Sequence, residues 1–161
     1  MKIHILAMGD RMPAWIDQGF AHYAARMPTF CQLALQPIPL QKRGKKADIK
    51  AVIKRESAQL LQAIPTAAYC VALERTGKQI STEKLAEQLR HWLASGQQPL
   101  ILIGGPEGLG TTVLHKAREI WSLSSLTLAH PIARLVVAEQ LYRAISIIQG
   151  LPYHRGPTWQ V

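Results

Sequence analysis

The 161-residue sequence has few acidic residues, only two cysteines and no long hydrophobic run. Ten Asp and Glu stand against nineteen Lys and Arg, giving a formal net charge of +9. This balance favours a polyanionic partner, and it leaves nucleic acid and an anionic membrane surface both open. Cys31 and Cys70 lie in apolar stretches without a CxxC or a His at metal-ligand spacing. They predict buried free thiols of a reducing compartment and no metal site.

The sequence also contains no segment typical of a signal peptide or a transmembrane helix. The apolar run at the N-terminus is too short for a secretory signal, and the longest apolar helix includes Arg134, Glu139 and Arg143. With 48% hydrophobic and 18% charged residues, the composition is that of a globular protein. The sequence therefore predicts a packed cytoplasmic protein with no membrane partner.

Strand and helix patterns alternate from end to end without a linker or repeat. Apolar runs predict strands at residues 3–8, 31–36, 67–73, 100–103 and 123–128. Helices are expected from Pro13, from Asp48 to Pro65, from Ser81 or Thr82 to Gly96, through Leu114, Ala117 and Ile120, and over residues 131–149. This alternation predicts a single α/β domain with a mainly parallel sheet of five or six strands and helices on both faces.

The stretch ILIGGPEGLG, residues 101–110, runs from a buried strand directly into glycines. Such a turn lets the backbone approach a ligand at the carboxyl end of a parallel strand, or it is simply a tight turn before a helix. It lacks GxGxxG and GK[ST], and Glu107 would repel a pyrophosphate. The loop therefore favours an uncharged or cationic nucleoside-like ligand. Glu74, after the third strand, either accepts from ribose hydroxyls or is only solvated.

The last helix is apolar around most of its circumference. Because such a helix must be buried on more than one side, the pattern favours a two-fold dimer. Glu139 and Arg143 form an i,i+4 pair on its polar stripe, either structural or with the Arg facing an anionic ligand. The apolar positions are Ile132, Leu135, Val136, Leu141, Ile145, Ile147 and Ile148.

Four separate stretches resemble one known family. KRGKKADIK (42–50), LIGGPEG (102–108), WSLSSLTLAHPIARLVVAEQLYRA (121–144) and PYHR (152–155) occur in the order found in the RlmH ribosomal RNA methyltransferases, which are small members of the SPOUT class. The similarity covers residues 1–155, which we expect to form one SPOUT methyltransferase domain. Residues 156–161 are an extension past the end of most members, in which Trp159 either stacks beside RNA or is disordered.

The resemblance implies a trefoil knot in the carboxyl half, a homodimer packed through the last helix, and S-adenosylmethionine as cofactor. It implies N3 methylation of a pseudouridine in helix 69 of 23S ribosomal RNA, on assembled ribosomes, by direct displacement without a metal or a covalent intermediate. Carried over position by position, the cofactor-binding residues are Leu73, Gly104, Gly105, Leu123, Ser124, Ser125, Leu126, Thr127 and Leu128.

The family also implies a role for the tail. Tyr153, His154 and Arg155 resemble its substrate-side motif, reaching from one protomer over the cofactor of the other. His154 is suited to take the proton, and Tyr153 to stack on the base or hydrogen-bond to it. Arg155 and Arg143 would hold phosphate, with Glu139 orienting Arg143. Which group acts as the base is left open by the sequence.

A basic block precedes and enters the second helix. In most proteins it would be a solvated face, and here it is expected to contact RNA backbone. Two other functions compete with methyl transfer: a nucleotide-binding oxidoreductase on a Rossmann-like or flavodoxin-like sheet, and a ribosome-binding module without chemistry. The block comprises Lys42, Arg43, Lys45, Lys46 and Lys50, with Lys54 one helical turn further.

Overall fold

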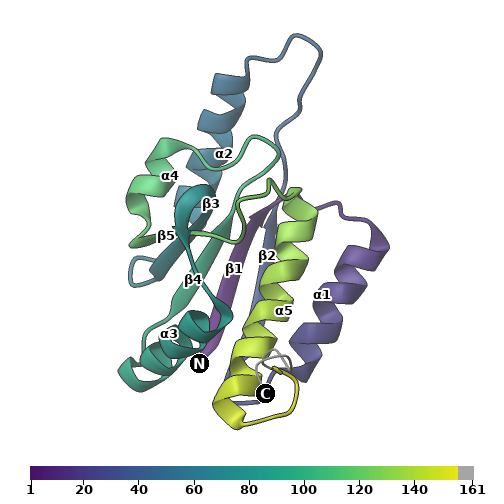
Figure 1. The fold of residues 1–161 in the computed structure, drawn as a ribbon. Helices are drawn as coiled ribbons and strands as arrows, with labels where there is room; N and C mark the ends of the chain where they lie inside the picture. Colours follow the sequence, from purple (N-terminus) through teal and green to yellow (C-terminus); the bar gives the residue numbers. More distant parts are fainter. Residues whose placement is uncertain (156–161) are drawn as a thin grey trace.

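The computed structural model describes residues 1–155, so the prediction for the extension at 156–161 lies outside the described residues. Strands and helices alternate along the described chain (Figure 1). They are β1 (Lys2–Met8), α1 (Ala14–Arg26), β2 (Gln32–Ile38), α2 (Ile49–Ala63), β3 (Tyr69–Gln79), α3 (Thr82–Ser95), β4 (Pro99–Ile103), α4 (Thr111–Lys116), β5 (Glu119–Ser122) and α5 (His130–Gln149).

The five strands form one sheet in the order β2-β1-β4-β3-β5, and every pair is parallel. This confirms the α/β class and the mainly parallel sheet of five or six strands. Strand order was not readable from the sequence, because register and neighbour choice depend on contacts between distant segments. The trefoil knot stays a prediction from the resemblance.

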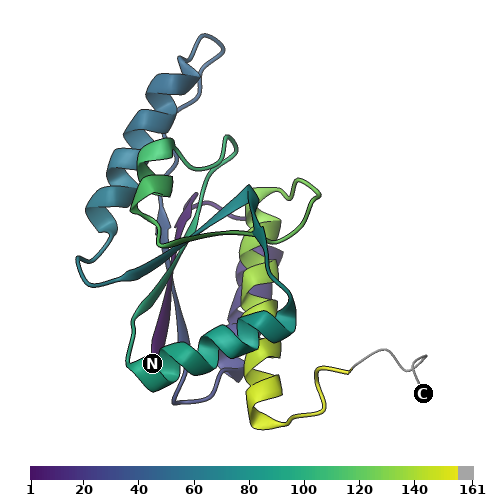
Figure 2. The ribbon, with the colours of Figure 1, turned by 60° about the vertical axis from the view of Figure 1, so that its left-hand side comes forward.

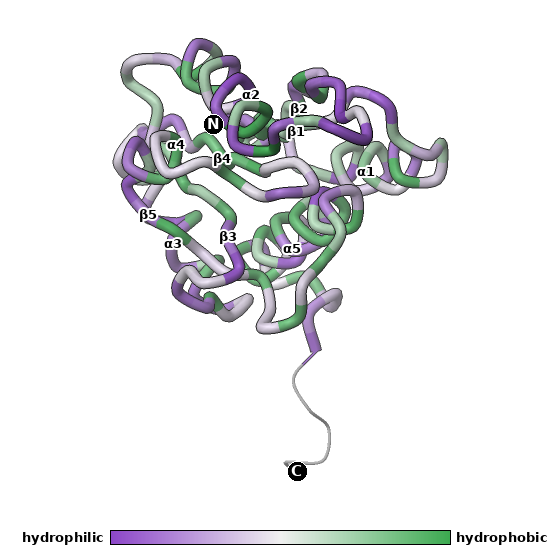
Figure 3. The backbone as a smooth tube through the Cα atoms, turned by 90° about the horizontal axis from the view of Figure 1, so that it is seen from above, coloured by the Kyte–Doolittle hydropathy of each residue, from purple (hydrophilic) through white to green (hydrophobic). Residues whose placement is uncertain are grey.

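Helices lie on both sides of the sheet (Figures 2 and 3). Alternate residues of β1, β3 and β4 pack into two different cores, one against each helical layer. Ile3 and Ile5 of β1 point into the larger core, with α1, α3 and α5, whereas Leu6 and Met8 point into the smaller core, with α2 and α4. Because successive side chains of a strand point to opposite faces, β1 and β4 must be apolar on both parities. The helices therefore cover both faces, as predicted.

Much of the apolar circumference of α5 is covered within one chain. The helix lies on the sheet between α1 and α3, with Leu141 and Ile145 buried. Its Leu135 packs so closely on α1 that a Cβ added at Gly19 would meet Leu135 Cδ1 at 2.8 Å. Ile132, Val136, Ile147 and Ile148 are half-buried. The dimer stays a prediction, and these half-buried positions are the surface available to it.

The region between β4 and α5 differs from the sequence-based expectation. Residues 123–128 form a loop, so the prediction of a strand there was wrong, and the last strand is β5. The helix expected through Ile120 ends at Lys116. Ile120 and Trp121 instead pair with β3, so tertiary pairing outweighs the helical spacing of three apolar residues.

Strand β3 continues past its predicted end at Leu73 as far as Gln79. Its pairing with β5 shifts register between Leu73 and Lys78, so Trp121 is opposite both. Gly77 makes this close passage possible, because a Cβ there would lie 2.7 Å from the Ile120 carbonyl oxygen. The loop expected to begin at Glu74 is therefore an irregular part of the strand.

Asp48 caps α2 as its position before the helix predicted, since its carboxylate accepts from the backbone N–H groups of Lys50 and Ala51. We expect Asp48→Ala to lower the free energy of unfolding by about 1 kcal/mol, because two helix N–H groups lose their acceptor. Urea unfolding measures the change. Asp48→Asn, which retains an acceptor, should lose much less, and equal losses for both variants would contradict capping as the cause.

Candidate functional site

A cavity of about 280 Å³ opens where the carboxyl ends of β3 and β4 meet the loop 123–128 and the start of α5. Its position follows the rule that ligands of parallel sheets bind beyond the strand carboxyl ends. The lining residues are Leu73, Glu74, Arg75, Ile103, Gly104, Gly105, Pro106, Glu107, Gly108, Leu123, Ser124, Leu126, Thr127, Leu128, His130 and Ala133.

Eight of the nine residues carried over as cofactor-binding positions line this cavity, and Ser125 is the one that does not. These residues come from three separate segments of the chain. Gly104 follows Leu73 by 31 positions, and Leu123 follows Gly105 by 18 positions. The structure thus brings together positions that the sequence alone could place only on separate strand ends.

The glycine turn 104–108 has no room for side chains at its first position. A Cβ on Gly104 would lie 2.5 Å from the carbonyl carbon of Gly108 and 2.8 Å from the nitrogen of Leu109. Gly105 and Gly108 pair as an antiparallel bridge, and Gly108 has φ of +80°, a conformation that favours glycine. The turn therefore exposes backbone to the cavity and depends on glycine for its shape.

Serine hydroxyls hold the loop 123–128 in its non-strand shape. Ser122 Oγ donates to the carbonyl oxygen of Ser124 over 2.9 Å, and Ser124 Oγ accepts from the N–H of Leu126 over 3.0 Å. Such side-chain bonds to nearby backbone replace ladder bonds, which is the physical reason for the failed strand prediction. Leu126, 72% exposed, is left at the cavity rim.

Two carboxylates border the cavity and both stay ionised at neutral pH. Hydrogen bonds from Thr76 lower the pKa of Glu74, and the hydrogen bond from Arg43 lowers the pKa of Glu107. His130 faces the same space, and burial, followed by the charge of Arg134, lowers its pKa and keeps the imidazole neutral. The Nδ1 atom of His130 is buried without a hydrogen-bond partner among residues 1–155. These groups suit a ligand with positive charge and polar atoms.

Arg134 anchors the start of α5 to the end of β1. It is only 2% exposed, and its Nη2 donates to the carbonyl oxygens of Gly9 at 2.8 Å and Met8 at 3.3 Å. A Cβ on Gly9 would lie 3.2 Å from His130 Cε1. The turn after β1 therefore fixes the helix end and the imidazole that border the cavity.

Arg43, predicted as an RNA contact, has its charge engaged inside the protein. Its guanidinium binds Glu56, at 2.8 Å from Nη1, and Glu107, at 3.0 Å from Nε. Glu56 is almost fully buried. This network joins the basic loop, α2 and the glycine turn.

The Glu107 pair predicts an acid-sensitive contribution to stability. Because the folded pKa lies below the ordinary value of 4.5, the contribution is present above pH 4.5 and is lost as pH falls through the folded pKa. We expect Glu107→Gln to lower the free energy of unfolding by about 1 kcal/mol at pH 7 and to leave a shallower loss down to about pH 3.5. Urea unfolding across this range measures both; parallel pH profiles for the two proteins would refute the pairing.

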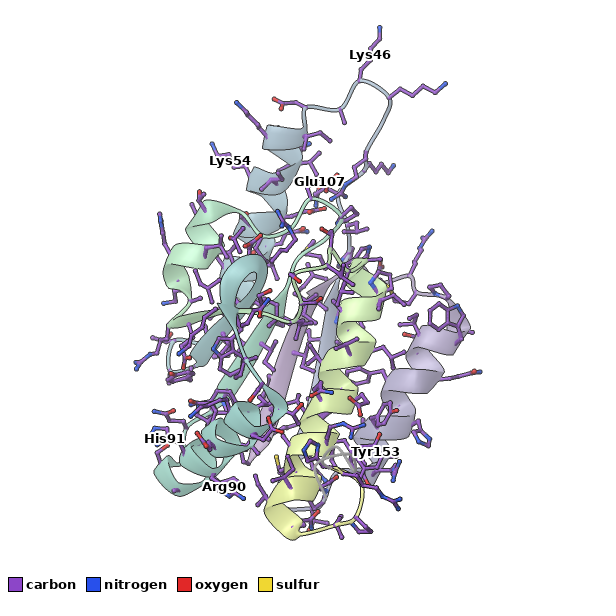
Figure 4. All side chains as sticks on the ribbon, viewed as in Figure 1. Lys46, Lys54, Arg90, His91, Glu107 and Tyr153 are labelled. Atoms are coloured by element: carbon purple, nitrogen blue, oxygen red, sulfur yellow. The ribbon has the colours of Figure 1, made fainter. Side chains whose placement is uncertain are left out.

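The remaining lysines of the basic block are exposed, as a surface for phosphate requires. The loop before α2 and the helix itself extend beyond the sheet, with Lys46 near the loop tip and Lys54 on the helix (Figure 4). Lys42, Lys45 and Lys50 are exposed along the same segment. The block lies at the same end of the molecule as Glu107 and the glycine turn (Figure 4).

Tyr153 is held in a cage of aromatic and charged groups after α5. Its hydroxyl donates to Glu139 Oε1 over 3.1 Å, and its ring lies 4.5 Å from the Arg143 guanidinium and 4.8 Å from the Tyr142 ring. Burial, followed by hydrogen bonds with Tyr23 and Glu139, raises its pKa to about 12, so the phenol is neutral. Tyr153 therefore fixes the start of the tail.

Glu139 holds Arg143 as the spacing predicted, with Oε1 at 2.6 Å from Nη2. Arg26 of α1 adds a second guanidinium, 4.2 Å from the Tyr142 ring centre and 5.3 Å from that of Tyr153. No local pattern marks Arg26, because its partners Tyr142 and Tyr153 are more than a hundred residues away. Arg155 is exposed and donates to the Pro152 carbonyl oxygen, at 3.3 Å.

His154 contacts α3 rather than the cavity. Its Nε2 lies 3.2 Å from Glu83 Oε1, and its Nδ1 has no hydrogen-bond partner within the described part of the chain. The structure therefore groups His154 with Tyr153, Arg143 and Glu139 at the carboxyl end of α5, in a second cluster that we call the tail cluster.

The cavity and the tail cluster lie at opposite ends of α5. His130 begins this 20-residue helix and the tail follows it, so about 30 Å separates the two at 1.5 Å per residue. Figure 4 shows Glu107 and Tyr153 toward opposite ends of α5. Within residues 1–155, the tail cluster of one chain therefore does not reach the cavity of the same chain.

Within residues 1–155, the structure contains no helix with the length and hydrophobicity of a membrane span. The same residues include no cluster of three or more His, Cys, Asp or Glu side chains arranged to hold a metal ion.

Arg75 and Ala133 line the cavity but were not among the predicted site residues. Ala133 lies about one helical turn after His130, so helical spacing could have indicated it. Arg75 could not be found in this way, because its position depends on the continuation of β3 past Leu73.

Solved structures of low identity share the fold. A probable methylase family protein from Haemophilus influenzae aligns with a TM-score of 0.57 at 16% identity, over 99% of this chain and 72% of that one. A probable methyltransferase from Bordetella pertussis aligns with a TM-score of 0.53 at 12% identity, over 89% of this chain and 95% of that one.

Sequence comparison is far more specific. Residues 1–154 match the family described as "Predicted SPOUT methyltransferase". Proteins named ribosomal RNA large subunit methyltransferase H are 46% identical in Thioalkalivibrio sulfidiphilus and 48% identical in Coxiella burnetii, each over 96% of this chain and at least 99% of the relative. The chain belongs to the SPOUT methyltransferase family, in the group named ribosomal RNA large subunit methyltransferase H.

Proposed function

We propose that this methyltransferase transfers a methyl group from S-adenosylmethionine to N3 of a pseudouridine in helix 69 of 23S ribosomal RNA, on assembled ribosomes in the cytoplasm. The observation that carries the proposal is the cavity, because eight of the nine family cofactor positions line it. Relatives named for the large ribosomal subunit RNA supply the substrate class.

The cavity suits a cationic nucleoside. Leu73, Ile103 and Leu128 offer apolar surface, and the glycine turn offers backbone groups. Glu74 offers negative charge, whereas the charge of Glu107 is already paired with Arg43. When bound, S-adenosylmethionine supplies a methyl group on a positively charged sulfur. No P-loop or dinucleotide motif is present in the sequence, which argues against the oxidoreductase alternative.

The tail cluster provides the groups that the substrate side needs. We assign the N3 proton to His154, whose Nε2 lies 3.2 Å from Glu83 Oε1 and whose Nδ1 is buried without a partner among residues 1–155, so the imidazole must leave Glu83 to act. Arg155 is exposed for phosphate. Arg143 and Tyr153 are tied to Glu139, so we assign them the positioning of the tail. Because this cluster is a helix length from the cavity, the active site is composite: the tail of one protomer serves the cavity of the other in a homodimer.

The test is methyl transfer from radiolabelled S-adenosylmethionine to ribosomes from cells that lack this protein. Label in the helix 69 pseudouridine is the expected result, with much less transfer to free ribosomal RNA because a small protein relies on the ribosome for recognition. Salt-dependent binding to ribosomes without any label would instead support the binding module without chemistry.

A further inference from the structure

Arg43 is the one member of the basic block whose side chain turns inward. Its neighbours Lys42 and Lys45 are exposed, whereas the Arg43 side chain is 20% exposed. Nη1 donates to Glu56 Oε1 and to the Gln41 carbonyl oxygen, both at 2.8 Å, and Nη2 donates to Glu56 Oε2 at 3.0 Å. Nε faces both oxygens of Glu107 at 3.0 Å. One guanidinium thus joins three separate segments.

The network is fixed at its inner end. Glu56 is 4% exposed, and its Oε1 also accepts from the Gln41 N–H over 2.9 Å. A forked guanidinium between two carboxylates has little freedom to rotate without losing charge-assisted hydrogen bonds. The position of Arg43 is therefore set by α2 and by the backbone of its own loop.

The outer end of the network is the wall of the cavity. Glu107 lines the cavity, and a Cβ on Gly105 would lie 3.4 Å from both Arg43 Nη2 and Glu56 Oε2. The glycine turn packs directly on the ion pair. A displacement of the basic loop must therefore move this turn or break the bridge.

We propose that Arg43 is a positioning residue for the cavity, and that its bridge to Glu107 couples occupancy of the basic loop by RNA to the affinity of the cavity for the methyl donor. The inference rests on the proposed function. Coupling between two binding sites is reciprocal, so a bound cofactor strengthens RNA binding by the same factor. Arg43 differs in this from the exposed lysines, whose loss weakens RNA binding alone.

Calorimetric titration with S-adenosylhomocysteine, which carries no transferable methyl group, tests the coupling without turnover. Arg43→Gln alone leaves the buried carboxylate of Glu56 without its ion-pair partner, which lowers the stability of the folded protein. The main variant is therefore Arg43→Gln with Glu56→Gln, which removes both charges. Arg90→Gln on the exposed face of α3 is the matched control for a lost arginine.

We expect the double variant to bind S-adenosylhomocysteine about tenfold more weakly than wild type, and Arg90→Gln to bind it equally well. Saturating assembled ribosomes should raise the affinity of wild type about fivefold, and that of the double variant not at all. In a Glu107→Gln background the same double change should have no further effect, because the bridge is already broken.

Wild-type affinity and wild-type enhancement in the folded double variant would overturn the inference, even if its melting temperature falls. If the double variant loses the coupling but still transfers detectable methyl groups to helix 69, the result supports both the inference and the proposed function. A wild-type protein that binds S-adenosylhomocysteine with coupling to ribosomes but methylates nothing would remove the proposed function and leave the coupling standing.

Discussion

Gly104→Ala is expected to weaken binding of S-adenosylmethionine at least about 100-fold, equivalent to about 2.7 kcal/mol. The added Cβ would lie 2.5 Å from the Gly108 carbonyl carbon and 2.7 Å from its oxygen, and both are backbone atoms that no rotamer change can move away. The turn must open, and with it the wall of the cavity. Methyl transfer should fall to the same extent or further.

Gly44→Ala is the matched control, because a Cβ on Gly44 meets nothing within 4 Å. It should bind the cofactor as wild type does. Calorimetric titration of both variants, after circular dichroism has established that each is folded, gives the comparison. Near-wild-type affinity in Gly104→Ala would show that the turn adapts and that the methyl donor binds elsewhere.

The core of the fold was predictable from local pattern. Ile3, Ile5, Leu6 and Met8 are apolar on both parities, which is the signature of a strand covered on two faces, and the structure places them in two cores. Asp48 before α2 likewise predicts an N-cap, because its carboxylate accepts from backbone N–H groups two and three residues later. In both cases the determining contacts are close in sequence or follow from the period of the element.

The rest depends on two physical causes, side-chain bonds to nearby backbone and contacts between distant segments. Serines at 122 and 124 bond to nearby backbone and turn an apolar run into a loop, while Trp121 joins β3 because Gly77 leaves room for the close passage. The engagement of Arg43 with Glu107 spans 64 residues. From the run of basic residues alone, Arg43 is expected to face solvent or RNA. No neighbouring residue in the sequence indicates that its carboxylate partner comes from another loop.

The cavity was predictable only in part. Position-by-position similarity selected eight of its lining residues, whereas their convergence depends on β3 and β4 being neighbours in the sheet. Glu107 was expected to select against pyrophosphate, and its low pKa beside Arg43 is consistent with a charged carboxylate there. The resemblance implies that the tail reaches the cofactor of the other protomer; this stays a prediction, and within one chain the tail cluster lies a helix length from the cavity.

His154→Ala is expected to lower the rate of methyl transfer about 10²- to 10⁴-fold, the usual contribution of a proton-transferring side chain. Cofactor binding should be unchanged, because His154 does not line the cavity of its own chain and the composite site assigns it to the substrate. His91→Ala, an exposed histidine on α3, is the matched control and should retain full activity. Single-turnover transfer to ribosomes measures the chemical step; a wild-type rate for His154→Ala would make the imidazole dispensable.

Mixing two inactive chains separates a composite site from a site within one chain. In a heterodimer of Gly104→Ala and His154→Ala chains, the intact cavity of the second chain meets the intact tail of the first, so one competent site forms. Random pairing makes about half of the dimers mixed with one of two sites active, and activity should return to about a quarter of wild type. If each tail served its own cavity, no pairing would unite the two intact parts, and the mixture would stay as inactive as its components. The 20 residues of α5 between cavity and tail make recovery the expected result.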